Sequence, residues 1–262
     1  MVDIKGRWAL VTGASRGIGK EIAIALSALG CNLVLHSRSV KHTNQLAAEL
    51  SDNGVRALSM AADLSDPEQV DRLLSDIDEA AIQIDILFNN AAIMQHNNGD
   101  CWAIPDEDFR NSFETNVLSP IKICNALIPS MIKRRWGRVI NLTTDMNRQP
   151  QFAPYAISKA ALRKFVEDFA PILEDTGVTM NALHPGWLRT DMGSDLADSS
   201  VESVIPGALV PALLSQDVSG KEFKAQDYAG MSLVQALVKA DRKTDPHMRF
   251  RKIQNEQQNS VL

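Results

Sequence analysis

Cysteines and metal-binding histidine patterns are scarce in this sequence. The three cysteines, Cys31, Cys101 and Cys124, are far apart and form no CxxC pair, so we expect free thiols rather than disulfides or a zinc site. The five histidines show neither HxxH nor HExxH spacing. A metal centre is therefore not expected.

An excess of basic residues and long apolar runs are also missing. The 262 residues include 27 Lys and Arg against 32 Asp and Glu, a net charge of −5, which gives no long-range attraction to nucleic acid or to an anionic membrane. No run reaches the roughly 18 apolar residues of a spanning helix. The opening MVDIKGRWALVTG leads almost directly into a strand and leaves no room for a signal peptide. We therefore expect a cytoplasmic protein that binds neither nucleic acid nor membranes.

Short apolar runs alternate with amphipathic stretches over the first two-thirds of the chain. Near-continuous apolar runs such as ALV and LVL indicate a parallel sheet that is buried on both faces. The alternation predicts an α/β fold, a single doubly wound Rossmann-type domain with a parallel sheet. The expected strands are 8–12, 32–36, 56–60, 84–89, 138–143, 179–183 and 221–224. The expected helices are 18–29, 40–52, 67–80, 107–134, 155–175 and 228–239.

The last third of the chain has a looser pattern. Residues 191–215 are rich in small side chains and contain Pro206 and Pro211, which predicts a mobile lid over the site. Residues 241–262 are polar and predict a C-terminal tail on the surface or on a partner subunit. We therefore expect a dinucleotide-binding catalytic domain over residues 1–240, followed by this tail.

The segment TGASRGIG, Thr12 to Gly19, lies between an expected strand and an expected helix. Gly13 permits a tight turn, Gly17 lets the backbone approach a pyrophosphate, and Gly19 lets helix and sheet pack closely. The helix N-terminus presents free N–H groups to phosphates. A plain turn is the alternative, but the position after a buried strand favours a dinucleotide site.

The end of the second expected strand bears on the choice of cofactor. An NAD site needs a carboxylate there for the ribose hydroxyls, whereas this strand ends in His36, Ser37 and Arg38. Arg38 and Arg16 can pair with a 2′-phosphate, although both could instead be solvated surface charges. The sequence predicts NADP(H) rather than NAD(H).

Tyrosine is rare, and one of the two tyrosines is followed by a lysine at helical spacing. Tyr155 and Lys159 lie on one helical face, directly after Pro154 as a helix starter. A neighbouring ammonium is expected to lower the pKa of Tyr155 and to let it exchange a proton with a carbonyl or alcohol oxygen. A half-buried tyrosine beside a surface lysine is the alternative. Tyr228 has no such lysine after it.

With TGASRGIG, then Asn89-Asn90-Ala91 and Tyr155-Ala-Ile-Ser-Lys159, the chain resembles the short-chain dehydrogenase/reductase family over residues 6–193. The segment HPGWLRTDM is similar to the branch that contains carbonyl reductases of the sniffer and C-factor type. The resemblance implies a homodimer or homotetramer built on residues 107–134 and 155–175. It also implies that Asn116 supports proton transfer. The implied cofactor-binding residues are Gly13, Ser15, Arg16, Gly17, Ile18, Gly19, Ser37, Arg38, Asp63, Leu64, Asn90, Ala91, Tyr155, Lys159, Pro185, Gly186, Leu188 and Thr190.

The family also has a serine hydroxyl that orients the substrate carbonyl, thirteen residues before the tyrosine. That count lands on Leu142, which has no hydrogen-bonding side chain. Counting from the strand start reaches Thr144, eleven residues before Tyr155, and implies a loop shortened by two residues. Thr144 is the first candidate and Thr143 the second; strand alternation places them on opposite faces. Ala92 replaces the glycine that usually follows Asn-Asn-Ala.

Several large side chains fall in segments that would border the pocket, and if they line it the substrate is largely apolar. Ordinary packing is the alternative. Asp145 would disfavour an anionic substrate, but a solvated loop acid explains it slightly better. The side chains concerned are Met94, Trp102, Met146, Trp187 and Met192.

The predicted function is an NADP(H)-dependent oxidoreductase that reduces a ketone or aldehyde. Tyr155 is the proton donor, Lys159 tunes it and anchors the ribose, and Thr144 and Asn116 complete the site. One alternative is a non-catalytic NADP(H)-binding sensor or partner protein of the same fold. An epimerase or dehydratase is a third possibility, and the lack of a substantial C-terminal substrate domain weighs against it.

Overall fold

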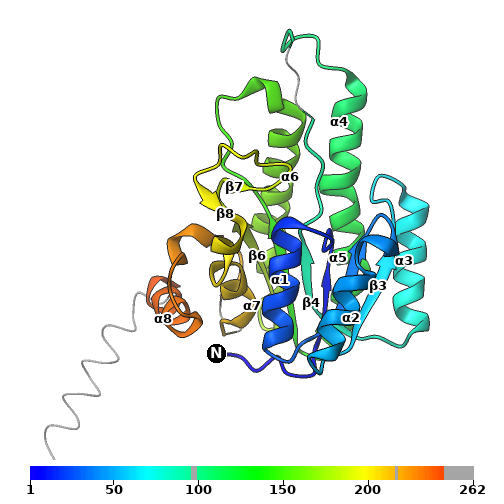
Figure 1. The fold of residues 1–262 in the computed structure, drawn as a ribbon, viewed down its shortest axis with the longest axis vertical. Coiled ribbons are helices and arrows are strands. Elements are labelled where there is room, and N and C mark those ends of the chain that lie inside the picture. Colours follow the sequence, from blue (N-terminus) through cyan, green and yellow to red (C-terminus); the bar gives the residue numbers. More distant parts are fainter. Residues whose placement is uncertain (96–98, 216–217, 245–262) are drawn as a thin grey trace, which may run out of the picture.

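The computed structural model describes residues 1–95, 99–215 and 218–244. Its centre is a seven-stranded sheet in the order β3-β2-β1-β4-β5-β6-β9, with every neighbouring pair parallel. The α/β Rossmann-type fold expected from the sequence is confirmed (Figure 1). The strands are β1 Trp8–Val11, β2 Asn32–Ser37, β3 Ala57–Ala61, β4 Ile84–Asn89, β5 Gly137–Leu142, β6 Val178–His184 and β9 Glu222–Lys224.

The central strands are buried on both faces, which explains their unbroken apolar runs. In β1, Ala9 and Val11 belong to one hydrophobic cluster, and Trp8 and Leu10 belong to the other. Helices α1, α2, α7 and α8 cover the first cluster, and α3, α5 and α6 cover the second (Figure 1). Alternating side chains of one strand therefore serve two cores. The helices are α1 Gly17–Ala28, α2 Asn44–Asp52, α3 Pro67–Glu79, α4 Asp106–Phe113, α5 Ser119–Lys133, α6 Ala153–Phe169, α7 Val210–Leu213 and α8 Leu233–Thr244.

The single helix predicted over 107–134 is interrupted. A π-helical turn, Glu114–Leu118, separates α4 from α5, and it contains the buried Asn116. π-helical turns are frequent at functional sites, and the apolar periodicity that predicts a helix does not reveal them. The helix predicted over 155–175 ends earlier, at Phe169, where a 3-10 turn, Ala170–Leu173, takes over with Pro171 in its first turn.

The predicted lid is largely part of the core. From Val204 to Leu214 the side chains are mostly buried, and this stretch packs against α1, α8 and β5. Gly207 explains part of the close packing, since a Cβ there would lie 2.2 Å from the carbonyl oxygen of Ala225. Earlier in the segment, a two-stranded parallel ribbon joins β7 Leu188–Arg189 to β8 Ser199–Ser200. A lid remains a prediction only for residues 191–203.

The expected tail begins inside a helix. Helix α8 starts five residues later than predicted and continues to Thr244, across the boundary expected at residue 240. Ala236, Leu237 and Ala240 are buried along it. The remainder of the predicted tail, residues 245–262, lies outside the described residues.

In the part of the chain that the structure describes, no helix has the length and hydropathy needed to cross a membrane. Over the same residues, no group of three or more His, Cys, Asp or Glu side chains is arranged to hold a metal ion. Cys31, Cys101 and Cys124 are free thiols. Burial raises the pKa of Cys31 and of Cys124 to about 12, so both stay protonated at neutral pH.

Strand order reverses between β1 and β4, because β2 and β3 lie to one side of β1 and the later strands to the other. In doubly wound sheets, ligands bind outside the carboxyl ends of the strands at such a switch point. The segments that follow β1 to β6 reach this edge, and they carry most of the predicted site residues.

Candidate active site

The turn after β1 has the geometry of a phosphate-binding loop. Gly13 and Gly17 have φ of +67° and +56°, in the left-handed region that favours glycine. A Cβ on Gly19 would lie 2.3 Å from the carbonyl oxygen of Gly13, so only glycine fits this position. Arg16, the N-cap of α1, makes no side-chain cap, and the first turn of α1 has no acidic residue. The exposed N–H groups and the helix dipole therefore suit an anionic pyrophosphate.

Thr12 and Asn90 tie this turn to the end of β4. The Thr12 hydroxyl accepts hydrogen bonds from the backbone N–H groups of Asn90 and Ala91, both at 3.0 Å. The Asn90 side chain donates to the carbonyl oxygens of Thr12 at 2.8 Å and Gly13 at 3.2 Å. Asn90 and Ala91 were predicted as cofactor residues, and the structure shows that both brace the glycine turn. Sequence reasoning missed Thr12, whose signal is its place directly before the first glycine.

The end of β2 has no carboxylate, as the sequence indicates. Ser37 is buried, and its hydroxyl donates to the carbonyl oxygen of Ser39 at 2.7 Å, while Arg38 is exposed. After β3, the Asp63 carboxylate accepts from the N–H and the hydroxyl of Ser65, and Leu64 is buried. The structure therefore places the residues predicted for the adenosine half of the cofactor along one edge of the sheet.

Lys159 lies almost completely buried beneath Tyr155. Its Nζ donates to the carbonyl oxygen of Leu142 at 2.8 Å and lies 5.9 Å from the centroid of the Tyr155 ring. Burial lowers the pKa of Lys159 to about 8 and raises the pKa of Tyr155 to about 12. The structure contradicts the expectation that the ammonium lowers the pKa of Tyr155, because loss of hydration dominates. Tyr155 is therefore a phenol at neutral pH, ready to donate a proton.

Asn116 joins the segment after β4 to the helix that carries Tyr155. Its Oδ1 accepts from the N–H of Ile93, and its Nδ2 donates to the carbonyl oxygen of Ile93 and to the hydroxyl of Ser158, all at 2.9 Å. The Ser158 hydroxyl in turn donates to the carbonyl oxygen of Tyr155 at 2.7 Å. Both amide hydrogens of Asn116 are thus used to brace the site, and only its Oδ1 retains accepting capacity.

The two threonines at the end of β5 differ in environment. Thr143 is 2% exposed, and its hydroxyl donates to Oε1 of Glu222 at 3.2 Å. Thr144 is half-buried, and its hydroxyl makes no hydrogen bond to any residue that the structure describes. The carbonyl oxygen of Leu142, the position reached by the family count, receives Lys159. Thr144 therefore has the hydroxyl available for a substrate.

Asp145 is neither a solvated loop acid nor an uncompensated negative charge that would repel an anionic substrate. Its carboxylate is paired with Lys224 on β9 at 2.7 Å and with Arg163 on α6 at 3.5 Å. The pKa of Asp145 is lowered, and the hydrogen bond from Lys224 is the largest cause. A carboxylate flanked by two cations is not a free loop acid, and its charge is compensated. It gives no reason to exclude an anionic substrate.

The segment after β6 lies directly above the glycine turn. Gly186 has φ of +91°, and a Cβ at Gly17 would lie 3.5 Å from Cγ2 of Thr190. Arg16 and Asp191 form an exposed ion pair across this contact, with Nε and Oδ2 3.0 Å apart. The predicted Pro185, Gly186, Leu188 and Thr190 are thus brought to the same edge as the turn.

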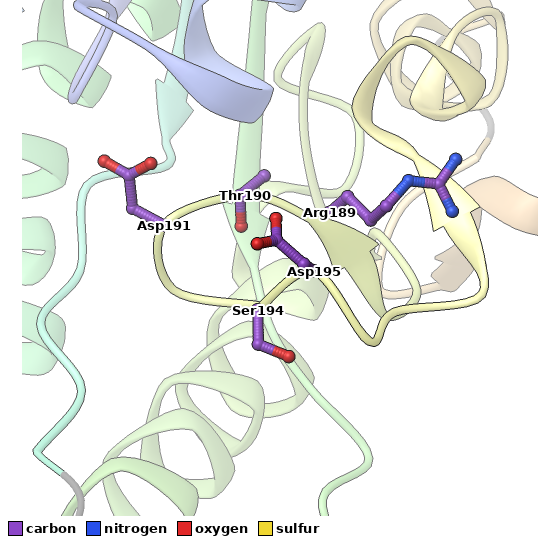
Figure 2. A pocket seen from close by; sticks show the side chains of 5 residues that line it. All are labelled: Arg189, Thr190, Asp191, Ser194 and Asp195. Carbon is purple, nitrogen blue, oxygen red and sulfur yellow. The ribbon is translucent and has the colours of Figure 1, made fainter.

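This segment lines a polar cavity of about 410 Å³. Figure 2 shows the side chains around it. The side chains of Arg189 and Asp191 point to opposite sides of the loop. Two of its lining residues, Thr190 and Asp191, lie against Gly17 and Arg16, so the cavity borders the glycine turn. It is lined by Arg189, Thr190, Asp191, Ser194 and Asp195.

The large side chains expected to border the pocket are only partly enclosed. Trp102 is 97% exposed, and Trp187 is 54% exposed with its Nε1 donating to the carbonyl oxygen of Gly193. Met192 is exposed, whereas Met94 and Met146 are half-buried. Trp102 therefore lines no enclosed pocket in this structure.

Comparison with known proteins agrees with this geometry. The family model of short chain dehydrogenases matches residues 7–200. A 3-oxoacyl-[acyl-carrier-protein] reductase of Synechocystis sp. is 33% identical over 209 residues, which are 79% of this chain and 84% of that protein. The oxidoreductase UcpA of Salmonella typhimurium is 34% identical over 203 residues, 76% of each chain.

Solved structures show the same relationship. A 3-oxoacyl (acyl-carrier-protein) reductase from Agrobacterium tumefaciens C58 with NADP bound has a TM-score of 0.75 at 27% identity, over 84% of this chain and 93% of that chain. A gluconate 5-dehydrogenase from Burkholderia cenocepacia J2315, in complex with NADP and tartrate, has a TM-score of 0.73 at 26% identity over the same shares. The chain belongs to the short-chain dehydrogenase/reductase family and is an NAD(P)-dependent oxidoreductase.

Proposed function

We propose that this enzyme reduces a ketone or aldehyde with NADPH. The observation that carries the proposal is the position of the buried Lys159 amine, which lies 5.9 Å from the centroid of the Tyr155 ring. Burial raises the pKa of Tyr155 to about 12, and Lys159 is anchored below it on the carbonyl oxygen of Leu142. An ammonium at this position can stabilise the phenolate that forms when Tyr155 donates its proton, and carbonyl reduction requires such a proton donor.

Each residue of the site has a part in this chemistry. When bound, the nicotinamide supplies the hydride to the carbonyl carbon. Tyr155 donates its proton to the carbonyl oxygen, and the free hydroxyl of Thr144 donates a hydrogen bond to the same oxygen. Lys159 lies close enough to stabilise the phenolate left on Tyr155, and Asn116 keeps the tyrosine helix in place through Ser158.

NADP(H) is the proposed cofactor because no carboxylate occupies the end of β2. Arg38 is exposed there, and Arg16 is held only by an exposed ion pair with Asp191, so both guanidinium groups are available to a 2′-phosphate. The structural relatives named above were solved with NADP bound. The proposed pyrophosphate cradle is the turn Gly13–Gly19.

For the substrate, we favour an apolar carbonyl compound. Trp187, Met192 and Leu196 are exposed on the segment beside the site, and Leu196 is 82% exposed. An acyl chain would cover such side chains, whereas a sugar acid would not. Relatives named for 3-oxoacyl and for gluconate substrates supply the two test classes. Membership of the sniffer and C-factor branch stays a prediction, since the relatives named here carry other names.

A homodimer or homotetramer through α5 and α6 also stays a prediction. The outer side of α6 and the turn after it expose Ile157, Phe169 and Ile172, and α5 exposes Ile132. Burying such side chains between subunits would be favourable. The cytoplasmic location is likewise proposed from the sequence alone.

The test is an NADPH-consumption assay with a 3-oxoacyl thioester, an oxidised gluconate and a set of simple ketones and aldehydes. We expect turnover with the thioester or the apolar ketones. Binding of NADPH in a fluorescence titration, with no turnover on any carbonyl, would contradict the proposal. That outcome would favour the non-catalytic NADP(H)-binding protein.

A further inference from the structure

The side chain of His36 occupies the space between the ends of three strands. It is the second-to-last residue of β2 and is 2% exposed, at the carboxyl edge of the sheet where the cofactor site lies. Its neighbours are β1, which leads into the glycine turn, and β3, which leads to Asp63 and Leu64. A polar ring buried at this position needs partners for both nitrogens.

The imidazole has such partners, one on each side. The N–H of Gly13 donates to Nδ1 at 3.3 Å, and Nε2 lies 3.0 Å from the carbonyl oxygen of Ala62. Because a backbone N–H only donates and a carbonyl only accepts, Nδ1 carries no proton and Nε2 carries one. This arrangement requires the neutral ring. Burial lowers the pKa of His36 to about 4, which keeps it neutral at physiological pH.

The first glycine of the turn is thereby held on both sides. Its N–H donates to His36, and its carbonyl oxygen accepts from the side chain of Asn90 at 3.2 Å. The backbone of His36 also holds the turn, since the N–H of Ala14 donates to the carbonyl oxygen of His36 at 2.9 Å. These bonds hold Gly13 at φ of +67°.

We propose that His36 is a positioning residue for the dinucleotide, whose ring fixes the orientation of the glycine turn and couples it to the segment after β3. The inference deepens the proposed function and depends on the NADP(H) site at this turn. A turn that is already ordered loses less entropy when it binds a phosphate, so it binds more tightly. The ring of His36 bonds to Gly13 and Ala62, so its effect is on cofactor affinity and not on the chemical step.

Three substitutions separate this role from simple packing. His36→Leu fills similar space without hydrogen bonds. His36→Asn places Oδ1 close to the position of Nδ1, so it can still accept from Gly13. His36→Gln extends an amide toward Ala62 but offers no acceptor near Gly13.

We expect His36→Leu to weaken NADPH and NADH by the same factor, about five- to tenfold in equilibrium fluorescence titrations. His36→Gln should behave like the leucine variant, and His36→Asn should stay within about twofold of the unmodified enzyme. The value of kcat at saturating cofactor should change by less than about twofold in all three variants. Equal affinities for the leucine variant and the unmodified enzyme would overturn the inference, as would an asparagine variant as weak as the leucine variant.

Hydrogen exchange of the Gly13 amide, followed by NMR without cofactor, gives a second readout. We expect faster exchange in His36→Leu and His36→Gln than in His36→Asn. Unchanged exchange in all three would overturn the inference. Because this measurement needs no cofactor, it still tests His36 if the enzyme fails to bind NADPH, which would refute only the proposed function. Should the leucine variant not fold, the asparagine and glutamine variants carry the comparison.

Discussion

Thr143 and Glu222, 79 residues apart in the sequence, are joined by a hydrogen bond of 3.2 Å between the threonine hydroxyl and Oε1 of the carboxylate. Two residues farther along each segment, Asp145 is paired with Lys224 at 2.7 Å. The edge strand β9 thus holds the residues on both sides of Thr144. Among the residues that the structure describes, the hydroxyl of Thr144 has no hydrogen-bond partner, and it becomes the candidate donor to the substrate oxygen.

Substitutions at the two threonines test this arrangement. Thr144→Ala should lower kcat by about 10²-fold or more, as removal of an oxyanion-type donor does. Thr144→Ser should keep most of the activity, because the hydroxyl remains. Thr143→Ala is the matched control: it should keep kcat and lower stability by about 1 kcal/mol through loss of the bond to Glu222. A dead Thr143→Ala variant with an active Thr144→Ala variant would reverse the assignment.

Replacing Tyr155 by phenylalanine tests the proton donor. The ring and its packing are kept, so NADPH affinity should not change. The rate should fall by about 10² to 10⁴-fold, since general acid catalysis is worth that much. Tyr228→Phe is the control, because Tyr228 is also buried but lies near Lys239. Near-normal turnover in Tyr155→Phe would remove this residue from the mechanism.

Cofactor selection should depend on Arg38. Arg38→Asp removes a phosphate partner and adds repulsion, so NADPH should bind about tenfold to a hundredfold more weakly, while NADH changes little. Arg72→Asp, on the exposed side of α3, controls for net charge, since Arg72 pairs with Glu68 on the same helix. Equal losses for both cofactors in fluorescence titrations would argue against a 2′-phosphate contact.

The stability of the fold should decrease in mild acid because of His36. Its pKa is about 4 in the folded protein and about 6.5 in the unfolded chain, because burial outweighs the opposite effects of the Ala62 carbonyl oxygen and of Asp63. Between these values the unfolded state binds one more proton, so the free energy of unfolding falls as the pH is lowered from about 6.5 to about 4. The shift corresponds to about 3 kcal/mol.

Denaturant unfolding of the unmodified enzyme and of His36→Asn over this pH range measures the effect. The asparagine variant has no titrating ring, so its stability should fall less steeply toward pH 4. Identical slopes for the two proteins would show that His36 does not titrate as its burial indicates.

Much of the site could be predicted because its signals are local in sequence. Gly13, Gly17 and Gly19 lie within one turn, and Tyr155 and Lys159 within one helical turn, so their spacing alone indicates their neighbours. The lid prediction was less successful. Prolines and small residues suggested a surface loop, but the side chains from Val204 to Leu214 complete the core beneath α1.

The sequence by itself determined the sheet, the glycine turn, the absence of a carboxylate after β2 and the Tyr155–Lys159 pair, because apolar periodicity and short spacings encode them. Only the tertiary structure decided which hydroxyl at the end of β5 is free, the direction in which the pKa of Tyr155 moves, and the partners of His36. Those depend on which strand ends become neighbours and how much water they exclude. The bond from Gly13 to His36 spans 23 residues, and the bond from Thr143 to Glu222 spans 79. No local pattern specifies contacts at such separations.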